Sequence, residues 1–216
     1  MKLLIFDVDG VLEKEERVAR ARLNNLVKLI ADKFKISRRE AEKRFFDRKK
    51  KIGKEPSSVR VLTSFGFTRN DFFRAIDVDK ANPAGLIEPH KHCREMLQKV
   101  SKGNKIVTLS NTSKRATVAT LKILKIEKYI DKAYSSEQFD ESKPSLKILR
   151  RILNDMRFKA RDAVYIGNSY EKDIRPAHKL GMKTILFNSE KKYKKAADVP
   201  EADFVIKDLI EIVKLV

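Results

Sequence analysis

Short apolar runs alternate with amphipathic segments along most of this chain. The first run, Leu3 to Phe6, is continuously apolar, which is typical of a strand buried on both faces of a parallel sheet. Further strands are predicted at 105–109, 133–135, 163–166, 183–187 and 204–206. Helices are predicted between them at 89–100, 113–124, 144–156 and 171–180, with a last one from Asp208. The alternation predicts an α/β fold with a Rossmann-like, doubly wound parallel sheet.

Residues 13 to 82 follow a different pattern and predict a small all-helical bundle. Four apolar residues recur at helical spacing and form one stripe: Leu23, Val27, Ile30 and Phe34. Capping boxes at Ser37–Glu40 and Thr68–Asp71 predict the starts of two later helices, and a helix over 57–65 is expected between them. We therefore divide the chain into an α/β core, residues 1–12 and 83–216, and a helical domain, residues 13–82.

Composition indicates the cellular compartment in which the protein works. The chain has 216 residues and a single cysteine, Cys93, so an intrachain disulfide is excluded and a reducing compartment is indicated. Charged residues follow the short apolar start at once, which is unlike a signal peptide. Apolar stretches stay well short of the roughly 18 residues that cross a bilayer. We expect a cytoplasmic protein without a membrane partner.

The formal net charge of +19 is unusual for a chain of this length. One interpretation is a nucleic-acid or other polyanionic partner, and such a field also attracts small anionic substrates. The other is a solvated surface rich in Lys and Glu, of the kind common in hyperthermophile proteins. Charged residues make up 37% of the chain, which favours the second interpretation.

Two carboxylates follow the first strand in the sequence Asp7-Val8-Asp9-Gly10. Open α/β sheets bind their ligands at the carboxyl ends of strands. Paired acids repel each other, and a divalent cation or a phosphoryl group would explain why they are placed together. Gly10 lets the backbone turn tightly beside a bound phosphate. The alternative is an Asx-rich turn after an edge strand.

Polar residues suited to phosphate chemistry follow three further predicted elements. Ser110 and Asn111 come at a helix start, where unpaired N–H groups bind anions. Lys143 places a cation just before another helix, and Gly167 to Asp173 (GNSYEKD) follows the strand at 163–166. Each segment alone is a weak signal, but all of them in this order form a strong one.

With these four segments the chain resembles the haloacid dehalogenase superfamily of hydrolases, which are mostly phosphatases. DVDGVL is similar to the family's first motif, Ser110 with Asn111 to its second, Lys143 to its third and GNSYEKD to its fourth. The resemblance covers nearly the whole chain and implies a Rossmann-like core with a helical lid. Residues 13–82 resemble the cap that the family inserts directly after its first motif.

The resemblance implies a role for each motif residue. Asp7 would be the nucleophile that forms an aspartyl-phosphate, and Asp9 the general acid and base. Ser110, the Asn111 backbone N–H and Lys143 would neutralise the phosphoryl oxygens. The acid at Asp9 favours phosphate-ester chemistry over dehalogenation.

Magnesium would be held by Asp7, the Asp9 carbonyl and the fourth motif, through Asn168 and Asp173. The family usually has Asp where this chain has Asn168. Either Asp173 takes the main role with Asn168 assisting, or the site has drifted and catalysis is poor. We favour the first interpretation.

The cap is expected to select the substrate, because a lid over the core contacts the leaving group. Its segment KRFFDRKKKIGK, residues 43 to 54, holds seven basic residues and one acidic residue. Arg44 and Arg48 are candidates for contact with a second anionic group. We favour the other interpretation, a solvated basic face on the outside of the helices, with Phe45 and Phe46 packed inward.

These patterns predict a Mg²⁺-dependent phosphohydrolase that acts on a small phosphorylated metabolite through an aspartyl-phosphate. A phosphomutase of the same superfamily is the nearest alternative. The other is a basic nucleic-acid-binding protein with a vestigial hydrolase core. The oligomeric state is not visible in the sequence.

Overall fold

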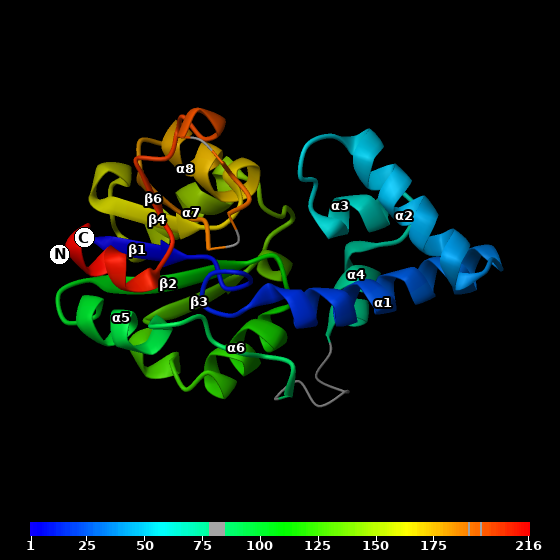
Figure 1. The fold of residues 1–216 in the computed structure, drawn as a ribbon, viewed down its shortest axis with the longest axis horizontal. Helices are drawn as coiled ribbons and strands as arrows, with labels where there is room; N and C mark the ends of the chain where they lie inside the picture. The colour runs from blue at the N-terminus through cyan, green and yellow to red at the C-terminus, as the bar shows by residue number, and fades with distance from the viewer. Residues whose placement is uncertain (78–84, 190, 195) are drawn as a thin grey trace.

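The predicted strands lie in one six-stranded parallel sheet with the order β3-β2-β1-β4-β5-β6 (Figure 1). The computed structural model describes residues 1–77, 85–189, 191–194 and 196–216. The strands are β1 (Leu3–Phe6), β2 (Lys105–Ser110), β3 (Lys132–Ser135), β4 (Ala163–Gly167), β5 (Lys183–Phe187) and β6 (Phe204–Ile206). The prediction of an α/β fold with a doubly wound parallel sheet is confirmed.

The register of the central strands determines where the polar segments meet. β1 lies between β2 and β4, and its last residue, Phe6, pairs with Thr108 on one side and Ile166 on the other. Asp7, which follows β1, therefore lies between the carboxyl ends of two neighbouring strands. The polar segments that follow β2 and β4 reach the same edge of the sheet.

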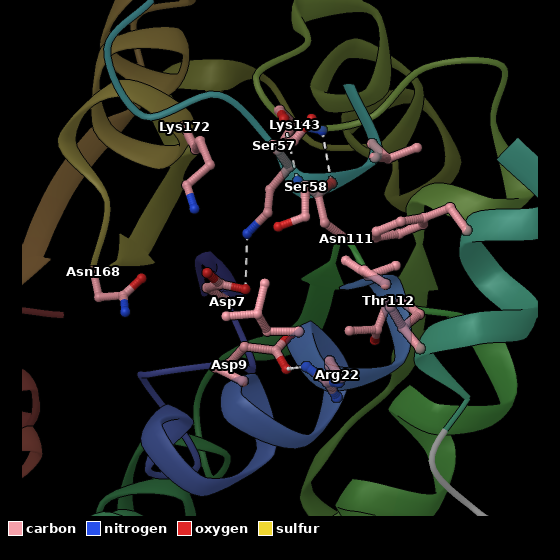
Figure 2. A pocket seen from close by; sticks show the side chains of 16 residues that line it. Asp7, Asp9, Arg22, Ser57, Ser58, Asn111, Thr112, Lys143, Asn168 and Lys172 are labelled. Carbon is pink, nitrogen blue, oxygen red and sulfur yellow. Dashed lines mark hydrogen bonds and ion pairs between the residues drawn. The ribbon is translucent and has the colours of Figure 1, made fainter. Parts of the chain in front are cut away.

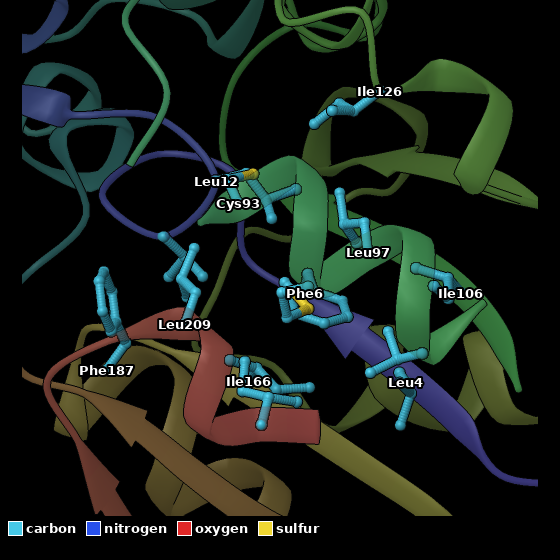
Figure 3. Packing of buried hydrophobic residues seen from close by; sticks show 14 of the residues in the cluster. Leu4, Phe6, Leu12, Cys93, Leu97, Ile106, Ile126, Ile166, Phe187 and Leu209 are labelled. Carbon is cyan, nitrogen blue, oxygen red and sulfur yellow. The ribbon is translucent and has the colours of Figure 1, made fainter. Parts of the chain in front are cut away.

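Helices cover both faces of the sheet, as the parallel arrangement requires. They are α5 (Cys93–Val100), α6 (Lys114–Ile123), α7 (Leu146–Met156) and α8 (Arg175–Lys179). Side chains of α5 and α6 pack with Leu4 and Phe6 on one face, in a cluster that includes Cys93 and Leu97 (Figure 3). Side chains of α7 and α8 pack with Leu3 and Ile5 on the other face. Alternate residues of β1 thus enter two separate cores.

Shorter helical turns complete this part of the chain. Five of them are single 3₁₀ turns or short 3₁₀ segments: Glu127–Tyr129, Ser136–Gln138, Ala160–Asp162, Ala196–Asp198 and Leu209–Lys214. A π-helical turn, Tyr170–Ile174, precedes α8. The single helix predicted at 171–180 is therefore wrong in its detail, because it is divided between this turn and α8.

Two other helix starts differ from the prediction. The helix expected at 89–100 begins at Cys93, because His92 has a φ of 58°, outside the right-handed helical region. The helix expected from Pro144 begins at Leu146, because the Ser145 side chain accepts a hydrogen bond from the Ile148 N–H and caps it.

Four helices form a separate layer beyond the edge of the sheet (Figure 1). They are α1 (Glu15–Phe34), α2 (Arg38–Ile52), α3 (Ser58–Thr63) and α4 (Arg69–Ile76), and they are called the helical unit below. They enclose their own apolar core, which includes Ile30, Phe45 and Leu62. The predicted domain boundary at 82/83 lies outside the described residues.

The capping and packing predictions for the helical unit hold in part. Thr68 and Asp71 form a complete capping box. Ser37 caps α2, but the Glu40 carboxylate pairs with Arg44. Phe46 is 40% exposed, so its predicted packing inward is wrong. Neighbouring helical residues point about 100° apart, and Phe45 already occupies the buried face.

The apolar stripe predicted on the first helix is also shorter than expected. Phe34 is 39% exposed, because it is the last residue of α1 and lies beyond the core of the helical unit. Among the described residues, no helix is both long enough and apolar enough to span a membrane.

Two adjacent chain segments connect the helical unit to the sheet. The Lys14 N–H donates to the Glu88 carbonyl at 2.8 Å, and the His90 N–H donates to the Leu12 carbonyl at 3.2 Å. Glu13 also forms an isolated bridge with Pro89. The chain thus leaves the sheet and returns to it at one place.

Candidate active site

A buried lysine joins two carboxylates at the carboxyl edge of the sheet. The Lys143 ammonium lies 2.7 Å from Asp7 Oδ1 and 2.9 Å from Asp173 Oδ1. Asp173 also accepts hydrogen bonds from the Tyr165 hydroxyl at 3.2 Å and from the Ser169 N–H at 3.1 Å. Both Asp173 oxygens are therefore engaged by neighbouring groups, and Asp173 is fully buried.

The fourth motif places its glycine directly against Asp173. A β-carbon added at Gly167 would lie 2.3 Å from the Asp173 β-carbon, a distance that real side chains do not reach. Gly167 is thus required for Asp173 to approach the lysine from behind β4. The glycine of the fourth motif thus has a packing role, because it leaves space for the Asp173 side chain.

Burial and neighbouring charges change the acidity of these groups. Burial, with the nearby Asp173 and Asp9 carboxylates, raises the pKa of Asp7 to about 8, although Lys143 opposes the shift. Burial alone would lower the pKa of Lys143, but the two carboxylates raise it well above its usual value. Lys143 is therefore a permanent cation beside Asp7.

Asp9 contacts one residue of the helical unit and one residue of the sheet. The Arg22 guanidinium of α1 pairs with Asp9 Oδ1, and the Ser110 hydroxyl donates to Asp9 Oδ2 at 2.6 Å. Burial by itself would raise the pKa of Asp9, but Arg22 and Ser110 lower it to about 2. Asp9 is thus an ionised carboxylate beneath the helical unit.

The second motif supports the third through its side chain. Asn111 Oδ1 accepts from the Lys143 backbone N–H at 2.7 Å, and Asn111 Nδ2 donates to the Lys143 carbonyl at 3.1 Å. Ser113 caps α6, with its hydroxyl accepting from the Ala116 N–H. The two hydrogen bonds of Asn111 fix the backbone from which the Lys143 side chain extends.

A cavity of about 140 Å³ lies between the sheet edge and the helical unit (Figure 2). Five of its lining residues are predicted site residues: Asp7, Asp9, Asn111, Lys143 and Asn168. Apolar side chains of the helical unit form much of the opposite wall: Leu23, Leu26, Val59, Phe72 and Ile76. The cavity therefore joins a charged floor to an apolar wall.

The remaining predicted site residues lie just outside this cavity. Ser110 is buried behind Asp9, and Asp173 is buried behind Lys143. Gly10 has a φ of 78°, consistent with its predicted role in a tight turn, and lines a neighbouring cavity.

Several lining residues were not identified from the sequence. They are Arg22 of α1, Ser57 and Ser58 at the start of α3, and Lys172 of the fourth motif. Arg44 and Arg48 do not line the cavity; instead, they bind Glu40 and the Ser64 carbonyl. The position of Lys172 inside the fourth motif was the one available signal.

Several side-chain contacts hold the helical unit against the core beside the cavity. Ser57 Oγ lies 3.3 Å from Ser142 Oγ, and Arg69 donates to the Ser136 carbonyl at 2.8 Å. Glu55, in the loop between α2 and α3, accepts from the Ser169 hydroxyl at 2.5 Å. Glu55 also accepts from the Tyr193 hydroxyl at 3.1 Å and pairs with Lys192.

Oxygen donors for a hard cation are present at the cavity floor. Asp7 and Asn168 line it, and the Asp9 backbone carbonyl belongs to the same turn. Mg²⁺ prefers such donors and usually keeps several waters. Among the described residues, no three His, Cys, Asp or Glu side chains are grouped for a metal ion. The donor set thus fits Mg²⁺ with few protein charges.

His92 and Cys93, at the start of α5, take part in contacts away from the cavity. His92 Nδ1 lies 2.8 Å from Asp208 Oδ2. Cys93 is buried in the sheet core, and burial raises the pKa of its thiol to about 12.

Two known phosphatases are similar to this chain in sequence. A glyceraldehyde 3-phosphate phosphatase of Methanocaldococcus jannaschii is 32% identical over 132 residues, 61% of this chain and 58% of that protein. A ribulose-1,5-bisphosphate 5-phosphatase of Halopiger xanaduensis is 28% identical over 137 residues, 61% of this chain and 56% of that protein. The aligned region spans less than two thirds of either relative.

A solved structure extends the likeness to the whole fold. The crystal structure of a HAD phosphatase from Thermococcus onnurineus superposes with a TM-score of 0.75 at 22% identity, covering 100% of this chain and 97% of that one. The family model for haloacid dehalogenase-like hydrolases matches residues 4–187. This chain belongs to the haloacid dehalogenase-like hydrolase family.

Proposed function

We propose that this protein is a Mg²⁺-dependent phosphatase that forms an aspartyl-phosphate on Asp7. The observation that carries the proposal is the buried pair of Asp7 and Lys143 at the floor of a small, partly apolar cavity. A carboxylate beside a fixed cation is suited to attack on phosphorus, because the lysine offsets charge on the transferring group.

The reaction would proceed in two steps on the residues described. Asp7 first loses to solvent the proton that its raised pKa favours. Its carboxylate oxygen then attacks phosphorus, and the bond from phosphorus to the leaving oxygen breaks. Asp9, which is ionised while it pairs with Arg22, first releases Arg22 and takes up a proton from solvent. It gives this proton to the leaving oxygen, then takes one from the water that releases phosphate from Asp7. Because Arg22 pairs with Asp9, Asp9 must exchange this contact for the leaving oxygen during the cycle.

Asp7, the Asp9 carbonyl and Asn168 are the residues that would hold Mg²⁺. The bound ion would supply charge neutralisation at the phosphoryl oxygens. Asp173 has a different role in this proposal, since both its oxygens are engaged by Lys143, Tyr165 and the Ser169 N–H. It orients the lysine.

The substrate would be a compact phosphorylated metabolite. The compact cavity of about 140 Å³ favours a small leaving group. The two relatives are named for glyceraldehyde 3-phosphate and ribulose-1,5-bisphosphate, which are both short sugar phosphates. We therefore propose small sugar phosphates and related esters as the substrate class.

Phosphate release tests the proposal directly. A panel of sugar phosphates is assayed with and without Mg²⁺ for the wild type, Asp7→Asn and the matched control Asp32→Asn, which changes an exposed carboxylate on α1. We expect Mg²⁺-dependent turnover that falls at least about a thousandfold in Asp7→Asn and persists in the control. Activity that survives Asp7→Asn, or no turnover on any ester, would overturn the proposal.

A further inference from the structure

Lys172 places a cation in the wall of the active-site cavity. Arg22 pairs with Asp9, and Lys143 lies between Asp7 and Asp173. The Lys172 ammonium contacts no carboxylate within the part of the chain that the structure describes, although its side chain lines the cavity. Its charge is therefore available to a ligand.

The backbone around Lys172 is firmly anchored. Its N–H donates to the Ser169 hydroxyl at 3.2 Å, and the next residue, Asp173, is fully buried against Lys143. Figure 2 shows the Lys172 side chain extending from this turn into the cavity, on the same side as Lys143. The ammonium is thus presented from a fixed turn.

A second, polar cavity of about 120 Å³ adjoins the first and shares Asn168 and Lys172 with it. Its other lining residues are Gly10, Ser169, Phe187, Asn188, Ser189 and Lys192. They include amides, hydroxyls and a second lysine that pairs with Glu55, and none of the lining residues is a carboxylate. This lining favours an anionic group.

The amide at Asn168 strengthens the preference of this lining for an anionic group. A carboxylate there would place a negative charge in the wall that both cavities share with Lys172. The neutral side chain keeps a carboxylate out of the wall that carries Lys172. Lys143 already serves the phosphoryl group beside Asp7, so Lys172 is left for a different part of the substrate.

We infer that Lys172 binds a second anionic group on the substrate, at the junction of the two cavities. The preferred substrates are then small phosphate esters that carry a carboxylate or a second phosphate besides the phosphoryl group that is cleaved. This inference rests on the proposed phosphatase function and assigns Lys172 as a specificity-determining residue.

Matched substrate pairs test this role. Glyceraldehyde 3-phosphate and 3-phosphoglycerate differ by an aldehyde against a carboxylate, and ribulose 5-phosphate and ribulose 1,5-bisphosphate by a hydroxyl against a phosphate. We expect the wild type to prefer the doubly anionic member of at least one pair. Lys172→Met lowers kcat/KM for that member about tenfold more than for its partner, as expected for one charged contact. The pair that responds identifies the group.

Two further variants complete the test. Lys172→Arg restores part of the preference, whereas Lys179→Met, a change at an exposed lysine of α8, leaves it as in the wild type. Equal losses on both members in Lys172→Met would assign the lysine to the cleaved phosphoryl group and overturn the inference. A wild type without preference in either pair would overturn it as well.

Binding separates this inference from the phosphatase proposal. Calorimetric titration of Asp7→Asn, with and without Lys172→Met, with both members of each pair needs no turnover. If no ester is hydrolysed but Lys172→Met selectively weakens the doubly anionic ligand, the catalytic proposal fails and the subsite stands. If hydrolysis occurs and that selectivity is missing in both assays, the subsite fails alone.

Discussion

Residue 168 is the position at which this site departs from the usual family pattern. An amide oxygen is a neutral donor, so a cation held there meets fewer protein charges than it would beside a carboxylate. Asp173 is fully buried and shared with Lys143, Tyr165 and a backbone N–H. It is therefore poorly placed to make up the missing charge.

Asn168→Asp should lower the Mg²⁺ concentration needed for half-maximal activity several-fold, with kcat retained, because a carboxylate replaces the neutral donor. Initial rates measured across a Mg²⁺ titration check this, together with direct Mg²⁺ binding. Asn154→Asp, on the exposed face of α7, adds the same charge far from the cavity and serves as the control. An unchanged titration in Asn168→Asp would contradict the assignment of this residue as a ligand.

The candidate site could be predicted from sequence wherever its residues follow strands. Asp7, Asn111 and Asn168 come directly after β1, β2 and β4, and parallel strands end at one edge. Arg22 could not be found in this way. Helical spacing places it beside the apolar stripe of α1, but only the approach of that helix to the sheet brings it to Asp9.

At the scale of elements, the loop between α2 and α3 contacts the fourth motif directly. Glu55 binds the Ser169 hydroxyl, and Ser169 caps the turn that presents Lys172. The same carboxylate reaches Tyr193 and Lys192 in the loop after β5. One loop of the helical unit thus touches two loops of the core.

Glu55→Ala should raise KM about three- to tenfold, because it removes charge-assisted hydrogen bonds that hold the helical unit over the cavity. Steady-state kinetics measure the change, and thermal unfolding shows whether stability is retained. Glu42→Ala, an exposed glutamate of α2, removes the same charge without these contacts. Kinetics equal to those of the control would mean that Glu55 has no part in closing the cavity.

Element boundaries were predictable where local capping decides them. The start of α4 follows from the Thr68–Asp71 box, and β5 and β6 have the predicted bounds. The start of α5 was missed because apolar spacing extends back toward Pro89, while His92 adopts a left-handed conformation that spacing does not reveal. The division between the π-helical turn and α8 was likewise not indicated by the spacing of apolar residues.

At the scale of the whole molecule, the net charge of +19 surrounds a site that receives an anion. Residues 13–82 contribute 20 basic and 11 acidic residues, so about half of the excess lies in and around the helical unit. A field of this sign raises the local concentration of phosphate esters near the cavity.

Raising ionic strength should therefore lower kcat/KM several-fold between about 20 and 500 mM KCl, with a smaller effect on kcat, because salt screens the attraction. Initial rates at low substrate concentration measure it. Sucrose at matched osmolarity serves as the control for solvent effects. A kcat/KM that does not depend on salt would mean that the charge has another purpose.

The paired crossing of the chain at Lys14 and Glu88 has a consequence for how such a protein can change. Every pairing of the six strands forms outside the segment between these two residues. A different insert between Lys14 and Glu88 would replace Arg22 and the apolar wall of the cavity. It would leave Asp7, Lys143 and Asp173 together. The architecture therefore lets the choice of leaving group diverge while the machinery for phosphorus stays constant.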